Sequence, residues 1–413
     1  MSLFTIFAVL ISITALLSYF NERVLRLPPT IGVMAAALSC SLLLALGGRL
    51  GLGVEAWAES LLVRIDFSEV LMHGMLSFLL FAGALHVDLG DLLERRWSIF
   101  SLATVGVALS TLLLGVIVHF AVRLFGLELP FGYALLFGAL ISPTDPIAVL
   151  GILRKANAPK RLEATIIGES LFNDGVGVVV FTLLLGVVAG GHGVTALEVG
   201  ELFLVEAVGG VLFGLGLGYA TYLLLKTVDQ HVVELLITLA TVSGGYALAG
   251  VLHTSGPIAM VVAGLFIGNH GRVFGMSDGT RQYQDVFWEL IDEILNALLF
   301  VMIGLEVLVL QWQPAFLLAG LLAIPIVLGV RFVCVGVPIA VLRVFRDFDP
   351  ATVRLMTWGG VRGGISIALA LSLPDSTHRE LILVMTYTIV VFSILVQGLT
   401  VGRAVRWSLA RAR

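Results

Sequence analysis

The chain has 413 residues, of which 59% are hydrophobic and only 13% are charged, and its formal net charge is −4. This composition excludes a soluble enzyme, a fibre and a disordered chain, and the small net charge gives no general attraction for nucleic acid. A helix needs about 20 apolar residues to cross the roughly 30 Å of hydrocarbon in a bilayer. The chain has many apolar runs of that length, so we expect a multi-pass membrane protein.

Apolar windows predict thirteen membrane-spanning helices, joined by loops too short to hold a separate domain. The first seven cover residues 3–20, 30–46, 70–87, 98–120, 131–153, 164–188 and 201–225. The other six cover residues 232–252, 256–269, 287–310, 315–342, 353–373 and 381–402. We therefore expect residues 1–413 to form a single transmembrane domain.

The basic residues predict the orientation of these helices. Most of the 24 lysines and arginines fall in alternate breaks between spans, and the opposite side holds only Arg49, Arg64, Arg123 and Arg379. Cytoplasmic loops carry the excess of positive charge in membrane proteins. The N-terminus is therefore expected outside and the C-terminus in the cytoplasm.

Five ionisable residues stand out inside the predicted spans, where a charge is costly to bury. They are Asp145 in the fifth span, Glu169 and Asp174 in the sixth, Arg331 in the eleventh and Arg362 in the twelfth. If each arginine pairs with one acid, one carboxylate has no partner. A proton and a small cation would compete for it, which is the minimal chemistry of an exchanger. The alternative is that all five residues only form pairs between helices.

Two spans are expected to be interrupted. The fifth contains Ser142-Pro143-Thr144-Asp145-Pro146, and the twelfth contains Gly359-Gly360-Val361-Arg362-Gly363-Gly364. Prolines and glycines break helices, which a membrane tolerates where the freed backbone lines a cavity. The two spans run in opposite senses, as an inverted repeat of spans one to six and eight to thirteen predicts. Asp145 and Arg362 could neutralise the half-helix ends, although close packing of small residues also explains the glycines.

These two motifs, together with Gly168 to Gly175 (GESLFNDG), resemble those of the NhaP-type sodium/proton antiporters of the cation:proton antiporter superfamily, relatives of the animal sodium/proton exchangers. The resemblance covers essentially the whole chain. It implies an all-α membrane protein with about thirteen transmembrane helices in two inverted six-helix repeats, with spans five and twelve interrupted and crossed.

The resemblance also implies a homodimer in the cell (inner) membrane. Residues 1–87 and 232–310 would then contribute mainly the dimerisation domain. Residues 98–188 and 315–402 would contribute mainly the ion-transporting core, and residues 201–225 would form the connecting helix.

The same resemblance implies roles for the site residues. Asp174 is the carboxylate that carries either ion, and Asp174, Ser170 and Thr144 are the expected oxygen ligands of Na⁺. Asn173 is expected to lie with them in the ion-binding site, and Asp145 to serve the crossing. The Asn173-Asp174 pair resembles that of the electroneutral members, which implies exchange of one Na⁺ or Li⁺ for one H⁺.

Two structural ion pairs are expected from the resemblance. Glu169 would bridge to an arginine, with Arg331 as the first choice, and Arg362 would then go with Asp145. The swapped arrangement, in which Glu169 pairs with Arg362, stays open. Acidic residues around span ten, Glu289, Asp292, Glu293 and Glu306, with Asn296 one turn after Asp292, form either a cytoplasmic funnel or an interfacial cluster.

Three other functions are compatible with parts of this pattern. A K⁺/H⁺ exchanger would use the same residues, because side-chain identities alone do not set ion size. An intramembrane aspartyl enzyme would need Asp145 and Asp174 to face each other without paired arginines, and a channel would need no alternating access. The sequence has no phosphate-binding glycine loop followed by Lys and Ser or Thr. We therefore expect a transporter driven by an ion gradient, with no catalytic residues and no cofactor.

Overall fold

The computed structural model describes residues 3–49, 67–145, 153, 159–190, 196–344 and 351–412, and all regular elements within these ranges are helices. A membrane favours this arrangement because a helix satisfies its backbone hydrogen bonds internally. The first half of the chain contains α1 (Leu3–Phe20), α2 (Pro29–Arg49), α4 (Phe67–Glu69), α5 (Leu76–Leu85), α6 (Leu89–Glu94), α7 (Arg96–Ser101), α8 (Val107–Ala121), α9 (Phe131–Ile141) and α11 (Lys160–Gly190).

The second half contains α12 (Ala196–Lys226), α13 (His231–Val251), α14 (Gly256–Phe266), α15 (Arg272–Gly275), α16 (Asp278–Glu306), α17 (Pro314–Leu342), α18 (Thr352–Gly359), α19 (Gly364–Leu371), α20 (Thr377–Phe392) and α21 (Leu399–Ala412). Short π-helical turns join α4 to α5, α7 to α8, α14 to α15 and α20 to α21. Each of these pairs is therefore nearly continuous.

Within the described residues, ten helical segments are long and apolar enough to cross a membrane. They correspond to ten of the thirteen predicted spans. The ninth is longer than predicted, because it runs from Gly256 to Gly275 instead of ending at residue 269. Residues 50–66, between the second and third predicted spans, lie outside the described ranges.

The other three predicted spans differ from simple crossings. The fifth is represented by α9, which ends at Ile141, and residues 146–152 lie outside the described ranges. The twelfth is divided into α18 and α19, with the break at 360–363 as the glycines predicted. The tenth is α16, which begins at Asp278 rather than near residue 287, because the Ser277 hydroxyl accepts a hydrogen bond from the Thr280 amide and caps the helix there.

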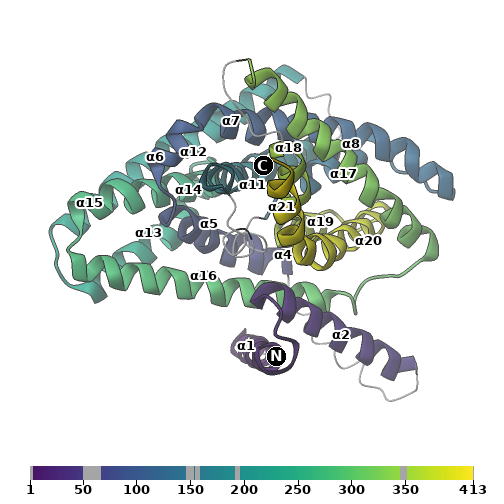
Figure 1. Ribbon diagram of the computed structural model, residues 1–413, viewed down its shortest axis with the longest axis horizontal. Helices are drawn as coiled ribbons and strands as arrows, with labels where there is room; N and C mark the ends of the chain where they lie inside the picture. The colour runs from purple at the N-terminus through teal and green to yellow at the C-terminus, as the bar shows by residue number, and fades with distance from the viewer. Residues whose placement is uncertain are drawn as a thin grey trace.

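The helices pack in two main groups. One group has α2 against α16 and α5 against α14, and the other has α8 against α9 and α17 against α20. In Figure 1 the long α16 runs along one edge with α1 and α2 beyond it, while α11 and α19 lie near the centre. Small residues allow the closest approaches. A Cβ on Gly304 of α16 would overlap Ala37 of α2, and the Ser41 hydroxyl donates to the Gly304 carbonyl at 2.8 Å.

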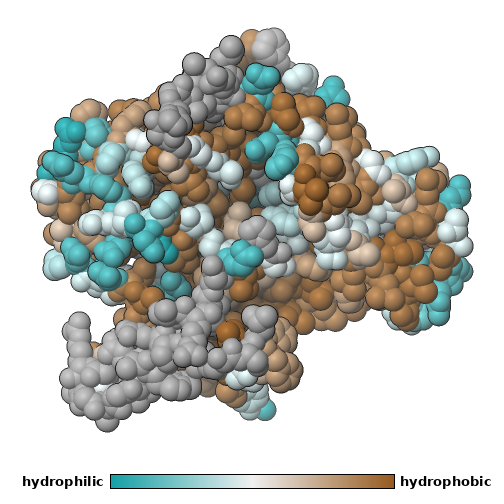
Figure 2. Space-filling view, turned by 180° about the vertical axis from the view of Figure 1, so that it is seen from behind, coloured by the Kyte–Doolittle hydropathy of each residue, from teal (hydrophilic) through white to brown (hydrophobic). Residues whose placement is uncertain are grey.

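Much of the outer surface is apolar, as Figure 2 shows for one face of the molecule. The exposed apolar residues of α12 include Leu202, Leu204, Val205, Val208, Leu212, Leu215 and Tyr219. Such extended apolar faces are unusual on soluble monomers and suit contact with lipid or another subunit. The described helices therefore have the surface of a multi-pass membrane protein.

Candidate functional site

The end of α9 meets the break between α18 and α19. The Asp145 amide, just beyond the end of α9, donates to the Val361 carbonyl between α18 and α19 at 2.8 Å. Ser142, Thr144 and Arg362 are all buried here. The prolines of one segment and the glycines of the other thus free backbone groups that bind each other across the crossing.

Arg362 and Asp145 lie at helix ends of opposite polarity. Arg362 Nη1 donates to the carbonyl oxygens of Ser142 at 2.6 Å and of Pro143 at 2.8 Å, where α9 ends. The Asp145 carboxylate lies beside Gly363, which immediately precedes α19, since a Cβ on Gly363 would be 2.5 Å from Asp145 Oδ2. A cation at a helix C-terminus and an anion at a helix N-terminus both offset the helix dipole. The hydrogen bonds of Arg362 thus reach the backbone at the end of α9.

Glu169 of α11 and Arg331 of α17 form a buried ion pair. Arg331 Nη2 donates to Glu169 Oε2 at 2.8 Å, and Nη1 donates to Oε1. Glu169 is only 1% exposed. Two parallel hydrogen bonds match the planar guanidinium to the carboxylate and fix α11 against α17. Of the two arginines considered from the sequence, Arg331 is therefore the one paired with Glu169 here.

Thr144, Ser170 and Asn173 form a hydrogen-bonded cluster beside Asp174. Thr144 Oγ1 lies 3.0 Å from Ser170 Oγ and accepts from Asn173 Nδ2 at 2.9 Å, and the Thr144 amide donates to Asn173 Oδ1 at 3.3 Å. Ser170 and Asp174 are four residues apart on α11 and share one helix face. The structure thus brings together four of the five residues that the resemblance assigned to the ion site, and the fifth, Asp145, lies at the crossing.

Asp174 faces a cavity of about 780 Å³. The side chain is 8% exposed. The walls of the cavity come from α5 and α16 on one side and from α11, α19 and the end of α9 on the other. Asp174 and Thr144 lie at the buried end, so water and small ions can reach the carboxylate through the cavity.

Charged residues surround the exposed end of this cavity. They are Asp88, Asp91, Lys160, Glu163, Arg272, Asp285 and Glu289. Arg272 is held by Asp285 through two hydrogen bonds of 2.9 and 2.6 Å. Acidic groups therefore outnumber the basic ones along the entrance, and a cation is attracted more than an anion.

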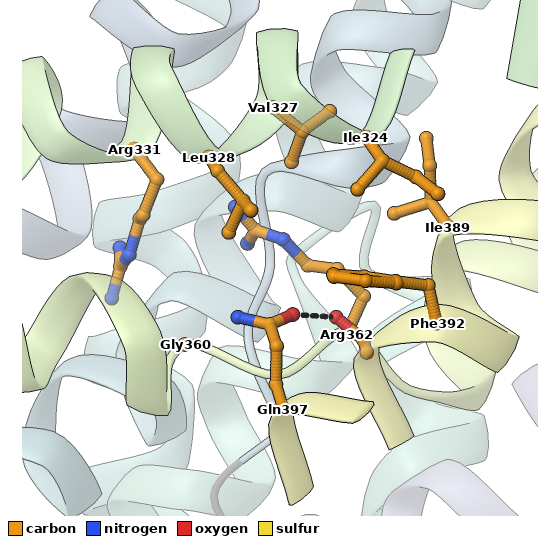
Figure 3. Close-up of a pocket in the computed structure, with 10 residues that line it drawn as sticks. Ile324, Val327, Leu328, Arg331, Gly360, Arg362, Ile389, Phe392 and Gln397 are labelled. Carbon is orange, nitrogen blue, oxygen red and sulfur yellow. Dashed lines mark hydrogen bonds between the residues drawn. The ribbon is translucent and has the colours of Figure 1, made fainter. Parts of the chain in front are cut away.

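Arg362 also borders a second, much smaller cavity, drawn in Figure 3, of about 10 Å³. Ile324, Val327 and Leu328 of α17 and Phe392 of α20 enclose it. Gln397 accepts a hydrogen bond from the Ser393 hydroxyl and donates to the Trp358 carbonyl at 3.0 Å. This volume is about that of one water molecule, so the space behind Arg362 is nearly filled.

The arrangement can bind a proton or a monovalent cation. Asp174 offers one ionisable carboxylate, and Thr144 and Ser170 add hydroxyl oxygens, which are the ligands that hard cations prefer. Among the described residues, no group of three or more His, Cys, Asp or Glu side chains could hold a metal ion. The ligand set therefore suits an ion of low charge that a proton can replace.

Two cavity residues carried little signal in the sequence. Ser366 is buried two residues after the glycine-rich break, and its hydroxyl has no hydrogen-bond partner in the described structure. Asn296 was noted in the sequence only as a neighbour of Asp292, yet both line the cavity. A neutral polar residue among apolar ones is common in membrane helices, and only its proximity to a glycine break or an acid marks it.

The chain is similar to known proteins over most of its length. The profile of the family described as "Sodium/hydrogen exchanger, transmembrane" matches residues 9–407. The chain is 54% identical to the Na⁺/H⁺ antiporter NhaP of Pseudomonas aeruginosa over 97% of this chain and 95% of that one. It is 36% identical to the Na⁺/H⁺ antiporter NhaH of Halobacillus dabanensis, over 81% and 82% of the two chains. The solved structure of the sodium proton antiporter MjNhaP1 from Methanocaldococcus jannaschii at pH 8 shares the fold, with a TM-score of 0.76, 19% identity and coverage of 98% and 99%.

Proposed function

The chain belongs to the sodium/hydrogen exchanger family, and we propose from this membership that it exchanges one Na⁺ or Li⁺ for one H⁺ across the cell membrane, with both ions competing for Asp174. It is a transporter and not an enzyme. The observation that carries the mechanism is the Asp174 carboxylate at the buried end of the large cavity, beside the Thr144 and Ser170 hydroxyls.

The cation is held by Asp174, Ser170 and Thr144. Asn173 supports this set, because its amide group donates to Thr144 Oγ1 and accepts from the Thr144 amide. That contact orients the Thr144 hydroxyl oxygen toward Ser170. When the proton occupies Asp174, the carboxyl group is neutral and loses most of its attraction for Na⁺.

The one-for-one stoichiometry follows from the charges around the site. Glu169 and Arg331 compensate each other, and Arg362 and Asp145 compensate the ends of α9 and α19. Among the charged groups described at the crossing, Asp174 is then the one without an ion-pair partner. One proton or one Na⁺ neutralises it, so each loaded state carries the same net charge and the exchange is electroneutral.

The proposed architecture has thirteen membrane crossings in two inverted six-helix repeats. The support is that α18 and α19 are separated by a break, and that the backbone after the end of α9 is hydrogen-bonded to this break. Residues 98–188 and 315–402 form the ion-transporting core, and residues 1–87 and 232–310 form the dimerisation domain of a homodimer. The connecting helix is 201–225.

This division also explains alternating access. The cavity has α5 and α16 of the dimerisation domain on one side and α11 and α19 of the core on the other. A shift of the core along that boundary would close the cavity and open Asp174 to the opposite side. The basic residues around the exposed end, Lys160 and Arg272, belong to breaks expected in the cytoplasm. The site is therefore open to the inside, with the N-terminus outside and the C-terminus in the cytoplasm.

The test is proton flux in liposomes that contain the purified protein and an imposed pH gradient. Na⁺, Li⁺ and K⁺ are added in turn, with the membrane potential either free or clamped by K⁺ and valinomycin. Flux triggered by Na⁺ or Li⁺ and insensitive to the potential is the expected result. Flux triggered by K⁺ alone would assign a different substrate, voltage-dependent flux would contradict the stoichiometry, and no cation-coupled flux would refute the exchange.

A further inference from the structure

We propose that the cavity holds a second cation subsite, separate from Asp174, formed by Asp292 and Asn296 of α16 and Ser366 of α19. Na⁺ would occupy this subsite on its way between the cytoplasm and Asp174. The inference rests on the proposed function, because it gives an exchanged cation a second position on the same path.

Asn296 is the first reason. It is only 2% exposed, and its Nδ2 group donates to the backbone oxygen of Asp292 at 2.8 Å and to Asp292 Oδ1 at 3.1 Å. These bonds fix the orientation of the amide, so that Asn296 Oδ1 has no partner in the described structure. A buried acceptor without a donor destabilises the folded protein. A cation in the cavity would satisfy that oxygen.

Ser366 supplies an independent second observation. Its side chain is 1% exposed, its hydroxyl has no partner in the described residues, and it lines the same cavity as Asn296. Leu299 of α16 packs directly against Gly364, the first residue of α19. Asp292, Asn296 and Leu299 follow each other at helical spacing and share one face of α16, so this face is turned toward α19.

The charges of the cavity select a cation. Asp292 carries the nearest carboxylate, and the Asp145 carboxylate and His86 are within electrostatic range of it. One carboxylate and one hydroxyl match the ligand types proposed for Na⁺ at Asp174, and the amide oxygen of Asn296 takes the place of the second hydroxyl. A single carboxylate carries too little charge for a divalent ion, which usually gathers more carboxylates. The subsite therefore repeats the chemistry of the transport site at a more accessible position.

Binding of radioactive sodium to the purified Asp174→Asn protein isolates the second subsite. We expect saturable binding to persist in this variant and to weaken about tenfold when Asn296→Ala is added, as the loss of one buried ligand contact implies. Glu289→Gln is the matched control, because Glu289 lies about two turns before Asn296 on α16, lines the same cavity and is exposed. Since Glu289 belongs to the charged entrance, its neutralisation should weaken the binding far less than Asn296→Ala does.

The conservative variant Asn296→Asp distinguishes a role of Asn296 as a cation ligand from a purely structural role of its amide group. Aspartate keeps an oxygen toward the cavity but cannot donate to Asp292, so a ligand role predicts retained or tighter Na⁺ binding, whereas a purely structural role predicts a loss equal to that of alanine. A loss equal to alanine's would overturn the subsite. Absence of sodium binding in Asp174→Asn would also overturn it. So would an effect of Glu289→Gln as large as that of Asn296→Ala, because it would indicate only the general electrostatic attraction of the acidic cavity.

Transport distinguishes this inference from the proposed function. In the otherwise unchanged protein, Asn296→Ala should raise the apparent KM for Na⁺ severalfold while the maximal rate of exchange is retained. An unchanged KM would overturn the subsite and leave exchange at Asp174 standing. If the unaltered protein showed no Na⁺-coupled proton flux, the proposed function would fail instead, and residual sodium binding in Asp174→Asn would still report on the subsite.

Discussion

Glu169 and Arg331 bind each other through both carboxylate oxygens while almost wholly buried, so each is the fixed counter-charge of the other. Removal of one partner leaves an uncompensated charge in a region of low dielectric. We therefore predict that Glu169→Ala destabilises the folded protein by about 3–5 kcal/mol. The measurement is thermal unfolding of the purified protein in detergent, followed by a tryptophan signal.

Two further variants test whether the stranded arginine is the cause. Asp375→Ala removes the acid from the exposed pair with Arg379 on α20 and should change the unfolding temperature little, because exposed ion pairs contribute little. The double variant Glu169→Leu with Arg331→Met should regain much of the lost stability. A double variant as unstable as Glu169→Ala would show that the pair itself, and not the unpaired charge, matters.

Asp174→Asn should abolish cation-coupled proton flux without loss of folding. Asparagine has nearly the same shape and keeps an oxygen, but it neither binds a proton nor carries the charge that holds Na⁺. Because no salt bridge joins Asp174 to a basic residue in the part of the chain that the structure describes, no opposite charge is stranded. Proteoliposome flux should fall to the level of empty liposomes, and size-exclusion elution should match that of the unaltered protein. Retained flux would refute Asp174 as the carrier.

Competition for a single carboxylate fixes how exchange depends on pH. Protons occupy Asp174 as the pH falls below the pKa of that site, so the apparent KM for Na⁺ should rise about tenfold for each further unit of acidification. Above that pH the apparent KM should be constant, and saturating Na⁺ should restore the same maximal rate. Initial rates over a grid of pH and Na⁺ concentration test this. A maximal rate that fell with acid at constant KM would instead indicate a separate proton sensor.

The sequence predicted the features of this fold that depend on local chemistry. Ten spans followed from apolar length, and the division of α18 from α19 followed from the glycines between Gly359 and Gly364. The early start of α16 was missed because its first turns are polar and its signal is the cap at Ser277, which a hydropathy window ignores.

Contacts between distant segments were harder to predict. The resemblance favoured Arg331 as the partner of Glu169, but the swap with Arg362 stayed open, because both lie in later apolar spans. The structure separates them, since the Arg331 guanidinium on α17 binds the Glu169 carboxylate on α11. Arg362 binds the carbonyls of Ser142 and Pro143, and backbone acceptors freed by a broken helix have no signal of their own in a sequence.

Gly363→Ala should impair exchange by displacing Asp145. The backbone φ of Gly363 is −122°, which any residue can adopt, so alanine adds no backbone strain. Its Cβ would lie 2.5 Å from Asp145 Oδ2 and 2.7 Å from Asp145 Cβ, so the carboxylate must leave its place before α19. The dipole of α19 would then be uncompensated beside the ion path, and we expect a lower rate of Na⁺-coupled proton flux.

Gly329→Ala is the matched control, because Gly329 lies within α17 and a Cβ there would meet nothing within 4 Å. It should leave the flux unchanged and, as an alanine in a helix, should not reduce stability. Both variants are compared by flux per folded protein at equal reconstitution. Full activity of Gly363→Ala would mean that Asp145 can move without consequence, and its proposed role at the crossing would then be wrong.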